Sequence, residues 1–131
     1  MGEGGIINIS SNHAFLTMSR HFPYNAVKAD INGMTCAMAL DSGPDISVNT
    51  VNPGWIAVMR TTDGMGDLKR EQLRSNHPVV RNRRPEDVAG VVSSLAGDDA
   101  AFITGKSILV DGGRSAVMQD DTLPDYRARR E

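Results

Sequence analysis

The pattern of apolar and polar positions divides the chain into three strand-like runs and two helical ones. Residues 6–10 are almost continuously apolar, residues 46–51 alternate between apolar and polar, and residues 107–111 form a third run. Between these runs the period changes to that of a helix, first over residues 24–40 and then over residues 85–96. Strands that alternate with helices pair in parallel through right-handed crossovers. We therefore predict an α/β fold with three parallel strands and crossover helices.

The two helical segments carry different signals. Pro85 suits the first helical position, Glu86 and Asp87 favour the positive end of the helix dipole, and Gly97 suits the stop. The earlier helix has an apolar stripe, made by Val27, Ile31, Met34 and Met38. It also has a stripe of small residues, made by Ala26, Ala29, Gly33 and Ala37. Small residues allow another helix to approach closely, either within the domain or from a second chain, and both alternatives stay open.

Three further segments have no regular period. Residues 12–23 read as a loop, and residues 55–80 are rich in Met, Gly and charge, which predicts a mobile segment or short helices. Residues 114–131 are polar and predict a mostly disordered tail. The predicted organisation is one domain over residues 1–113 followed by that tail.

Composition narrows the class of protein without identifying a function. The 131 residues allow one domain at most, and a net charge of −2 gives no reason to expect nucleic acid or an anionic membrane as a partner. The single cysteine, Cys36, excludes an internal disulfide and fits a reducing compartment. Its position within the helix predicts a small buried side chain. Without a signal peptide or an apolar run long enough to span a bilayer, we expect a cytoplasmic location.

Candidate chemistry lies where the first strand meets the first helix. Ser11 ends the strand, and Tyr24 and Lys28 lie one turn apart on the same face of the helix. A free tyrosine phenol has a pKa of about 10, so it exchanges protons poorly near neutral pH. A nearby ammonium favours the phenolate, and a serine hydroxyl can hold a substrate oxygen. Taken singly, each of the three residues has an ordinary explanation as a cap, a surface ring or a solvated charge.

The spacing of these residues and four later segments together resemble the short-chain dehydrogenase/reductase family in its single-domain, NAD(P)-dependent form. The likeness runs in family order over roughly residues 4–113. Its motifs are the serine strand at 5–11, Tyr24-x-x-x-Lys28, Asn-Pro-Gly-Trp-Ile at 52–56, Arg-Pro-Glu-Asp-Val-Ala at 84–89, and Ile-Thr-Gly-Lys at 103–106 with Val-Asp-Gly-Gly at 110–113.

The resemblance implies roles for the three candidate residues and a nicotinamide cofactor. Tyr24 would be the acid/base, Lys28 would tune it and hold the nicotinamide ribose, and Ser11 would orient the substrate. The implied reaction is hydride transfer between NAD or NADP and a small alcohol or carbonyl substrate. In the family the helix over residues 24–40 also packs against its counterpart in a second subunit, which implies a homo-oligomer.

Further implied contacts lie after the second strand. Pro53, Gly54 and Ile56 would face the nicotinamide, and Trp55 and Met59 are candidate substrate contacts. The family usually has a threonine at the position of Val58, whose side chain cannot make the hydrogen bond of a hydroxyl.

Other clusters are expected to have no functional role. The three histidines lack the spacing of metal ligands and are interpreted as loop residues, so no metal site is predicted (His13, His21, His77). A short basic cluster is interpreted as a solvated approach to the second helix (Arg81, Arg83, Arg84).

One expected motif is missing from this sequence. A dinucleotide fold holds pyrophosphate on a Gly-rich turn between its first strand and helix, whereas residues 2–5 precede a strand. The chain therefore resembles the C-terminal half of such an enzyme, with the last three of seven strands, part of a Rossmann-like fold. Its first strand would have an open apolar edge, so the chain alone is expected to oligomerise, to aggregate or to need another polypeptide.

Three functions fit this partial likeness. The first is an oxidoreductase whose truncated chain is inactive alone. The second is a non-enzymatic remnant whose first helix serves as a dimerisation or interaction module. A weaker third alternative is an epimerase or dehydratase relative that shares Tyr-x-x-x-Lys, but the Val-Asp-Gly-Gly ending favours the single-domain reductases.

Overall fold

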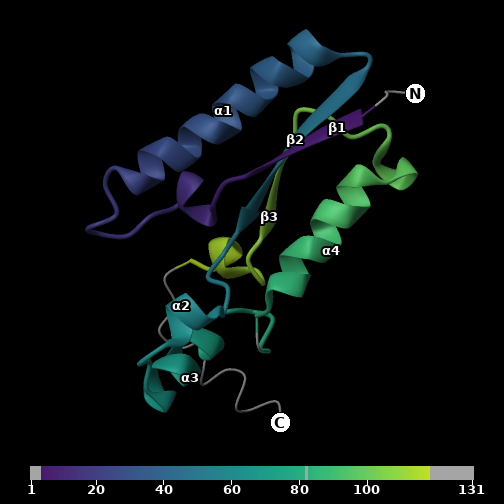
Figure 1. Ribbon diagram of the computed structural model, residues 1–131. Helices are drawn as coiled ribbons and strands as arrows, with labels where there is room; N and C mark the ends of the chain where they lie inside the picture. Colours follow the sequence, from purple (N-terminus) through teal and green to yellow (C-terminus); the bar gives the residue numbers. More distant parts are fainter. Residues whose placement is uncertain (1–3, 82, 119–131) are drawn as a thin grey trace.

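The computed structural model describes residues 4–81 and 83–118 (Figure 1). Three parallel strands form one sheet in the order β1-β2-β3, which confirms the predicted α/β fold. The strands are β1 (Gly4–Ile9), β2 (Ile46–Pro53) and β3 (Ser107–Val110). The α-helices are α1 (Tyr24–Ser42), α2 (Met59–Thr62), α3 (Asp67–Ser75) and α4 (Pro85–Ala96).

Helices α1 and α4 cover opposite faces of the sheet (Figure 1). Thr50 of β2 is hydrogen-bonded to Thr35 of α1, whereas the next residue, Val51, packs with Leu95 of α4. Successive side chains of a strand point to opposite faces, so these two contacts place the helices on different sides of β2. The central strand β2 is therefore covered on both faces.

The face of the sheet toward α4 forms the apolar core. Val51, Leu95 and Ala100 are buried together. Partly buried aliphatic side chains from α4, β1 and β3 surround them (Ile7, Val88, Val91, Val92, Ile108, Val110). Hydrophobic burial thus attaches α4 to the sheet.

The face toward α1 is held by polar side chains. Thr35 is fully buried; its hydroxyl contacts the Thr50 hydroxyl and accepts a hydrogen bond from Asn8 Nδ2 at 2.9 Å. At the start of α1, the Ser10 hydroxyl donates to the backbone carbonyl of Lys28 at 2.6 Å. These bonds connect α1 to β1 and β2 along several turns of the helix.

The predicted apolar stripe of the first helix is only partly correct. Val27 and Met34 are 58% and 47% exposed, whereas Ile31 and Met38 are partly buried. The stripe of small residues (Ala26, Ala29, Gly33, Ala37) is exposed throughout. Cys36 is also exposed, so the prediction that it is buried was wrong. The reason is the rotation of the helix: the hydroxyl of Thr35 faces the sheet, which turns the small residues outward.

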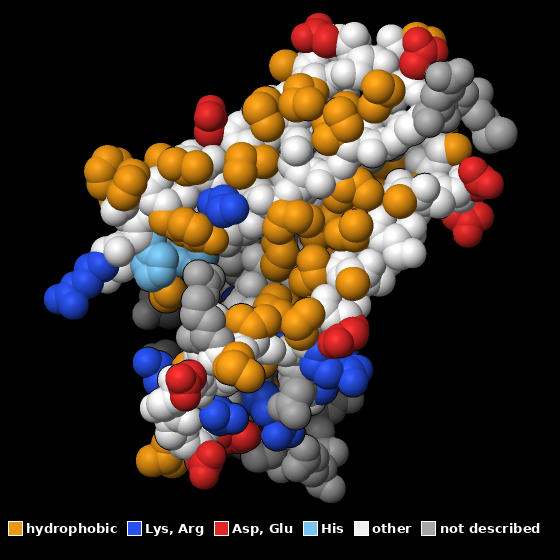
Figure 2. Space-filling model, viewed as in Figure 1, with side chains coloured by type: hydrophobic (Ala, Val, Ile, Leu, Met, Phe, Trp, Pro, Cys, Tyr) orange, Lys and Arg blue, Asp and Glu red, His pale blue; other side chains and the backbone are white. Residues whose placement is uncertain are grey.

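Strand β1 is an edge of the sheet, as its sequence predicted. Ile6 and Ile9 are 36% and 48% exposed although β1 is apolar. Figure 2 shows apolar side chains gathered on this face of the molecule, in the region between α1 and α4. An apolar edge strand with unpaired backbone groups is a surface to which another polypeptide can add.

The remaining segments are short. Residues 55–80 contain α2 and α3, which agrees with the prediction of short helices there, and Asn12–Ala14 form a single 3-10 turn within the predicted loop. A further 3-10 turn covers Arg114–Ala116, and residues 119–131 of the predicted tail lie outside the described part of the chain. In the described ranges, none of the helices has the length and apolar character needed to cross a membrane.

Candidate functional site

Ser11 lies two residues after the end of β1 and is 6% exposed. Its hydroxyl oxygen accepts a hydrogen bond from the backbone N–H of His13 at 3.2 Å, so it caps the 3-10 turn. The nearest acceptor for the hydroxyl proton is Asn12 Oδ1 at 3.5 Å, a long contact. The serine is therefore fixed by its role as a cap, while its proton remains available to a ligand.

Tyr24 and Lys28 lie on the first turns of α1, at the same end of the sheet. The Lys28 ammonium is 5.7 Å from the centre of the Tyr24 ring and donates to the carbonyl of Ile9 at 3.3 Å. The Tyr24 side chain is 45% exposed, and its hydroxyl has no hydrogen-bond partner in the described ranges. The backbone carbonyl of Lys28 also accepts a hydrogen bond from the Ser10 hydroxyl. Both the backbone and the side chain of this lysine are therefore bonded to the segment at the end of β1.

His13 connects Ser11 with Tyr24, a contact that the sequence interpretation missed. Its ring meets the Tyr24 ring edge-on, with centres 5.7 Å apart, and stacks on His21 at 4.5 Å. Partial burial is the main cause that lowers the pKa of His13, and the nearby His21 is the second cause. An imidazole that stays neutral adds no positive charge beside Tyr24. Two histidines between Ser11 and Tyr24 were the only sequence signal for this contact.

The Pro-Gly turn packs closely against the end of β3. Pro53 is the last residue of β2, and the N–H of Gly54 donates to the carbonyl of Val110 at 3.0 Å. A Cβ atom on Gly54 would lie 2.7 Å from the Cβ of Asp111. Only glycine fits this approach, so the turn has a structural requirement independent of any ligand.

The loop after Gly54 leaves one backbone donor available. Among the described residues, the N–H of Ile56 has no hydrogen-bond partner. The hydroxyl of Thr61 contacts the carbonyl of Ile56 at 2.9 Å and accepts from the N–H of Val58 at 3.0 Å. Thr61 is thus engaged in starting α2 and does not supply the hydroxyl that Val58 lacks.

Trp55 is partly buried and stacks on the buried Arg83, which in turn contacts the buried His77. The Arg83 guanidinium lies 4.8 Å from the centre of the Trp55 ring and 2.7 Å from Nε2 of His77. His77 Nδ1 lies 2.8 Å from the carbonyl of Leu73, so Nδ1 donates and Nε2 is the acceptor for Arg83. Burial and, secondarily, the charge of Arg83 lower the pKa of His77 to about 4, which makes this imidazole neutral near pH 7.

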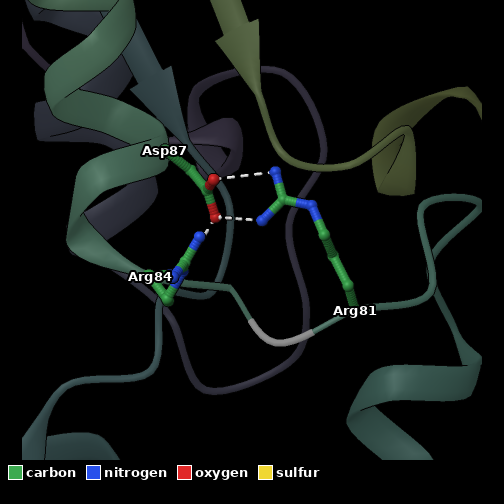
Figure 3. A network of polar contacts seen from close by, with 3 residues as sticks. All are labelled: Arg81, Arg84 and Asp87. Atoms are coloured by element: carbon green, nitrogen blue, oxygen red, sulfur yellow. Dashed lines mark hydrogen bonds and ion pairs between the residues drawn. The ribbon is translucent and has the colours of Figure 1, made fainter.

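The prediction of a solvated basic cluster was wrong for Arg83 alone, since Arg81 and Arg84 are exposed. Arg83 is only 8% exposed, because it packs under Trp55. Arg81 makes a two-pronged ion pair with Asp87, at 2.7 and 2.8 Å, and the backbone N–H of Arg84 donates to the same carboxylate at 2.9 Å (Figure 3). The hydrogen bond from Arg81 is the main reason that the pKa of Asp87 is lowered to about 2.

Two further predictions concern Met59 and metals. Met59 is the first residue of α2 and is 86% exposed, so it makes little packing contact with the other described residues. In those same ranges there is no group of three or more His, Cys, Asp or Glu residues that could hold a metal ion.

Comparison with known proteins assigns the family. The profile described as enoyl-(acyl carrier protein) reductase matches residues 1–115. The acetoacetyl-CoA reductase of Allochromatium vinosum is 34% identical over 86% of this chain, and the L-rhamnose 1-dehydrogenase (NAD(P)(+)) of Azotobacter vinelandii is 39% identical over 90%. The chain belongs to the short-chain dehydrogenase/reductase family.

This short-chain dehydrogenase/reductase chain spans about half the length of its relatives. It covers 46% of the acetoacetyl-CoA reductase and 47% of the L-rhamnose 1-dehydrogenase. The ligand-free aldohexose dehydrogenase of Thermoplasma acidophilum superposes with a TM-score of 0.82 at 31% identity, over 93% of this chain and 52% of that one. A gluconate 5-dehydrogenase of Burkholderia cenocepacia, solved with NADP and tartrate, gives 0.80 at 26% identity, over 89% of this chain and 47% of that one.

Proposed function

We propose that this chain forms the catalytic part of an NAD(P)-dependent oxidoreductase that transfers hydride between the nicotinamide and an alcohol or carbonyl substrate. One observation carries the proposal: Ser11, Tyr24 and Lys28 meet at one end of the sheet, joined through His13 and through the carbonyl of Ile9. Family membership supports the same reaction class.

The chemistry of the three side chains follows from their surroundings. Tyr24 has a free hydroxyl and can give a proton to, or take one from, a substrate oxygen. The Lys28 ammonium lies one turn away, 5.7 Å from the centre of the Tyr24 ring, where it would tune this phenol in the proposed reaction. Ser11, whose oxygen is held by the N–H of His13, donates its proton to the same substrate oxygen and orients it.

The residues present fit the nicotinamide end of NAD or NADP. When bound, the cofactor supplies or accepts the hydride. The unpartnered N–H of Ile56 is suited to hold a carboxamide, and Pro53 and Gly54 fix the loop that presents it. Tyr24 and Lys28 would hold the ribose. Trp55 and Met59 remain candidate substrate contacts, although the stack on Arg83 gives Trp55 a structural role as well.

The proposal includes a complementary segment, which the chain needs to form the complete enzyme. It lacks a Gly-rich turn after a strand, and its open β1 edge leaves Ile6 and Ile9 exposed. A parallel strand with its helices, added at this edge, would bury the apolar surface and bring the phosphate-binding turn. Without it, residues 1–113 would be inactive. The cytoplasmic location expected from the sequence stays a prediction.

The outward face of α1 supports self-association and a second candidate function. Val27 is 58% exposed, Met34 is 47% exposed and Leu40 is 83% exposed, beside the exposed small residues Ala29 and Gly33. Two copies of α1 could pack closely along this face, giving the homo-oligomer predicted for residues 24–40. If this contact alone were functional, the chain would be a non-enzymatic dimerisation module.

An assay with a complementary segment tests the enzymatic proposal. The chain is mixed, or coexpressed, with the part of the A. vinelandii L-rhamnose 1-dehydrogenase that it does not match. Oxidation or reduction is then followed at 340 nm with a panel drawn from the relatives: L-rhamnose, cyclohexanol and acetoacetyl-CoA. We expect turnover only in the mixture, and a loss of about 100-fold or more for Tyr24→Phe and for Lys28→Met.

Lys69→Met, on exposed α3, is the matched control and should keep full activity. An active mixture in which Tyr24→Phe turns over normally would contradict the assigned acid/base. Stable self-association of the chain, with neither nucleotide affinity nor turnover in the mixture, would favour the dimerisation module.

A further inference from the structure

A cavity of about 230 Å³ lies between the loop that follows β2 and the loop that follows β3. Its walls include Trp55 and Ile56 from the first loop, Asp111 from the second, and Arg81, Arg83 and Asp87 near the start of α4. We call it the Arg83 cavity. Ser11, Tyr24 and Lys28 do not line it, whereas Trp55 and Ile56 belong both to its walls and to the loop proposed to face the nicotinamide.

The two carboxylates in its walls already have partners. Asp87 is neutralised by the two-pronged pair with Arg81 and by the N–H of Arg84 (Figure 3). Asp111 accepts hydrogen bonds from the N–H of Gly113 at 3.0 Å and from the N–H of Ser115 at 2.8 Å. Neither forms an ion pair with Arg83.

Arg83 is the charge in the walls that has no counter-ion. It is 8% exposed, and among the described residues its guanidinium contacts only the neutral His77 ring, through one nitrogen, and the face of Trp55. Desolvation lowers the pKa of Arg83, since no acidic group offsets its burial. Buried arginines are almost always paired, because an uncompensated charge in the interior is costly. The remaining guanidinium nitrogens offer donors in a planar fork that matches carboxylate or phosphate oxygens.

We propose that the Arg83 cavity binds a small anion through carboxylate or phosphate oxygens, with Arg83 as its counter-ion and Trp55 as its wall. The volume suits a small anionic group rather than a dinucleotide, since pockets for drug-sized ligands begin at about 300 Å³. This binding does not depend on the proposed oxidoreductase activity.

The chain provides its own reporter for the test. Trp55 is the only tryptophan of the sequence and touches Arg83, so its fluorescence should respond to an anion at the guanidinium. Phosphate, methyl phosphate and acetate are each titrated at constant ionic strength, balanced with sodium chloride. A saturable change with acetate alone assigns a carboxylate ligand, and a change with the two phosphates alone assigns a phosphate ligand.

Three variants test whether Arg83 is responsible for the fluorescence response to the anions. Arg83→Met keeps the length and removes the charge, and should abolish the saturable response. Arg83→Lys keeps the charge without the fork and should weaken binding about tenfold or more. Arg74→Met, at an exposed position on α3, should bind as the native chain does.

Far-ultraviolet circular dichroism accompanies each titration to show that the variant is folded. If Arg83→Met does not fold, Arg83→Lys alone carries the comparison. A native chain that gives no saturable change with any of the three anions overturns the proposal, as does an unchanged response in a folded Arg83 variant.

Discussion

The two faces of strand β2 are attached to their helices by different forces. Toward α4, Val51 packs with Leu95 and Ala100 in an apolar core. Toward α1, the neighbouring residue Thr50 contacts the hydroxyl of Thr35, and the apolar residues of α1 lie largely outside this contact. One strand thus separates a layer held by hydrophobic burial from a layer held by hydrogen bonds.

The difference matters because two of the candidate catalytic residues, Tyr24 and Lys28, lie on the helix that the polar layer holds. Hydrophobic burial stabilises a helix without fixing its rotation or its height on the sheet, whereas hydrogen bonds are directional. The bond from the Ser10 hydroxyl to the Lys28 carbonyl and the bond from Asn8 to Thr35 both define where α1 lies. We infer that the α4 layer chiefly determines stability and the α1 layer determines the placement of Tyr24 and Lys28.

Removing a large side chain from the α4 layer should have the largest effect. Leu95→Ala deletes a buried side chain from the core and should lower the free energy of unfolding by about 2–5 kcal/mol. The same substitution on the outer face of α1, Leu40→Ala, should change the value measured on the monomer by less than about 0.5 kcal/mol, because Leu40 is 83% exposed there. Urea denaturation of both variants measures the difference. Equal effects would contradict the assignment of the core to the α4 layer.

The polar layer should respond in a non-additive way. Thr35→Val leaves Asn8 and Thr50 without their buried partner and should cost about 1–3 kcal/mol. Adding Thr50→Val removes a second polar group from the same site, so the double variant should cost less than the sum of the two single variants. A double-mutant cycle from urea midpoints tests this. Strict additivity would mean that the two hydroxyls are not coupled.

Two glycine substitutions should have opposite signs. Gly54→Ala places a Cβ 2.7 Å from Asp111 and should destabilise the fold by about 1–3 kcal/mol. Gly33→Ala, on the exposed face of α1, meets nothing within 4 Å and should stabilise the monomer by about 1 kcal/mol through helix propensity. Thermal unfolding at a fixed oligomeric state compares them. A destabilising Gly33→Ala would indicate that a second copy packs closely on this face.

The buried His77 ring should make stability depend on pH. The unfolded chain binds the proton near pH 6.5 and the folded chain near pH 4, so unfolding takes up a proton between these values. Stability from this group is therefore complete above pH 6.5 and is lost as the pH falls toward 4. The thermal midpoint of the native chain should fall relative to that of His77→Gln across this window. Parallel curves would show that His77 is not buried as a neutral ring.

The sequence predicted the elements well and the rotation of α1 poorly. Strand and helix positions follow from local periodicity, and the start of α4 follows from Pro85 and Asp87. The buried face of α1 was missed because an apolar stripe suits either a core or an interface between chains. The buried face of α1 is determined by the contacts of the Thr35 hydroxyl with Thr50 and Asn8, which lie 15 and 27 residues away in the sequence.

The candidate site also has a part that the sequence predicted and a part that it did not. The spacing of Ser11, Tyr24 and Lys28 predicted that they gather at one strand end, and the contacts through His13 and Ile9 agree with that placement. Their catalytic roles remain predictions. The burial of Arg83 under Trp55 could not be predicted, because residues 77–83 have no period and Trp55 lies in a different loop.

Calorimetric titration with NADH and NADPH tests the central claim most directly. The chain is titrated alone and in the mixture with the complementary part of the A. vinelandii dehydrogenase, at a known oligomeric state. We expect saturable binding only in the mixture, weakened in Lys28→Met and unchanged in Lys69→Met. A folded mixture that binds neither nucleotide would contradict the account, and so would a chain that alone binds as tightly as the mixture.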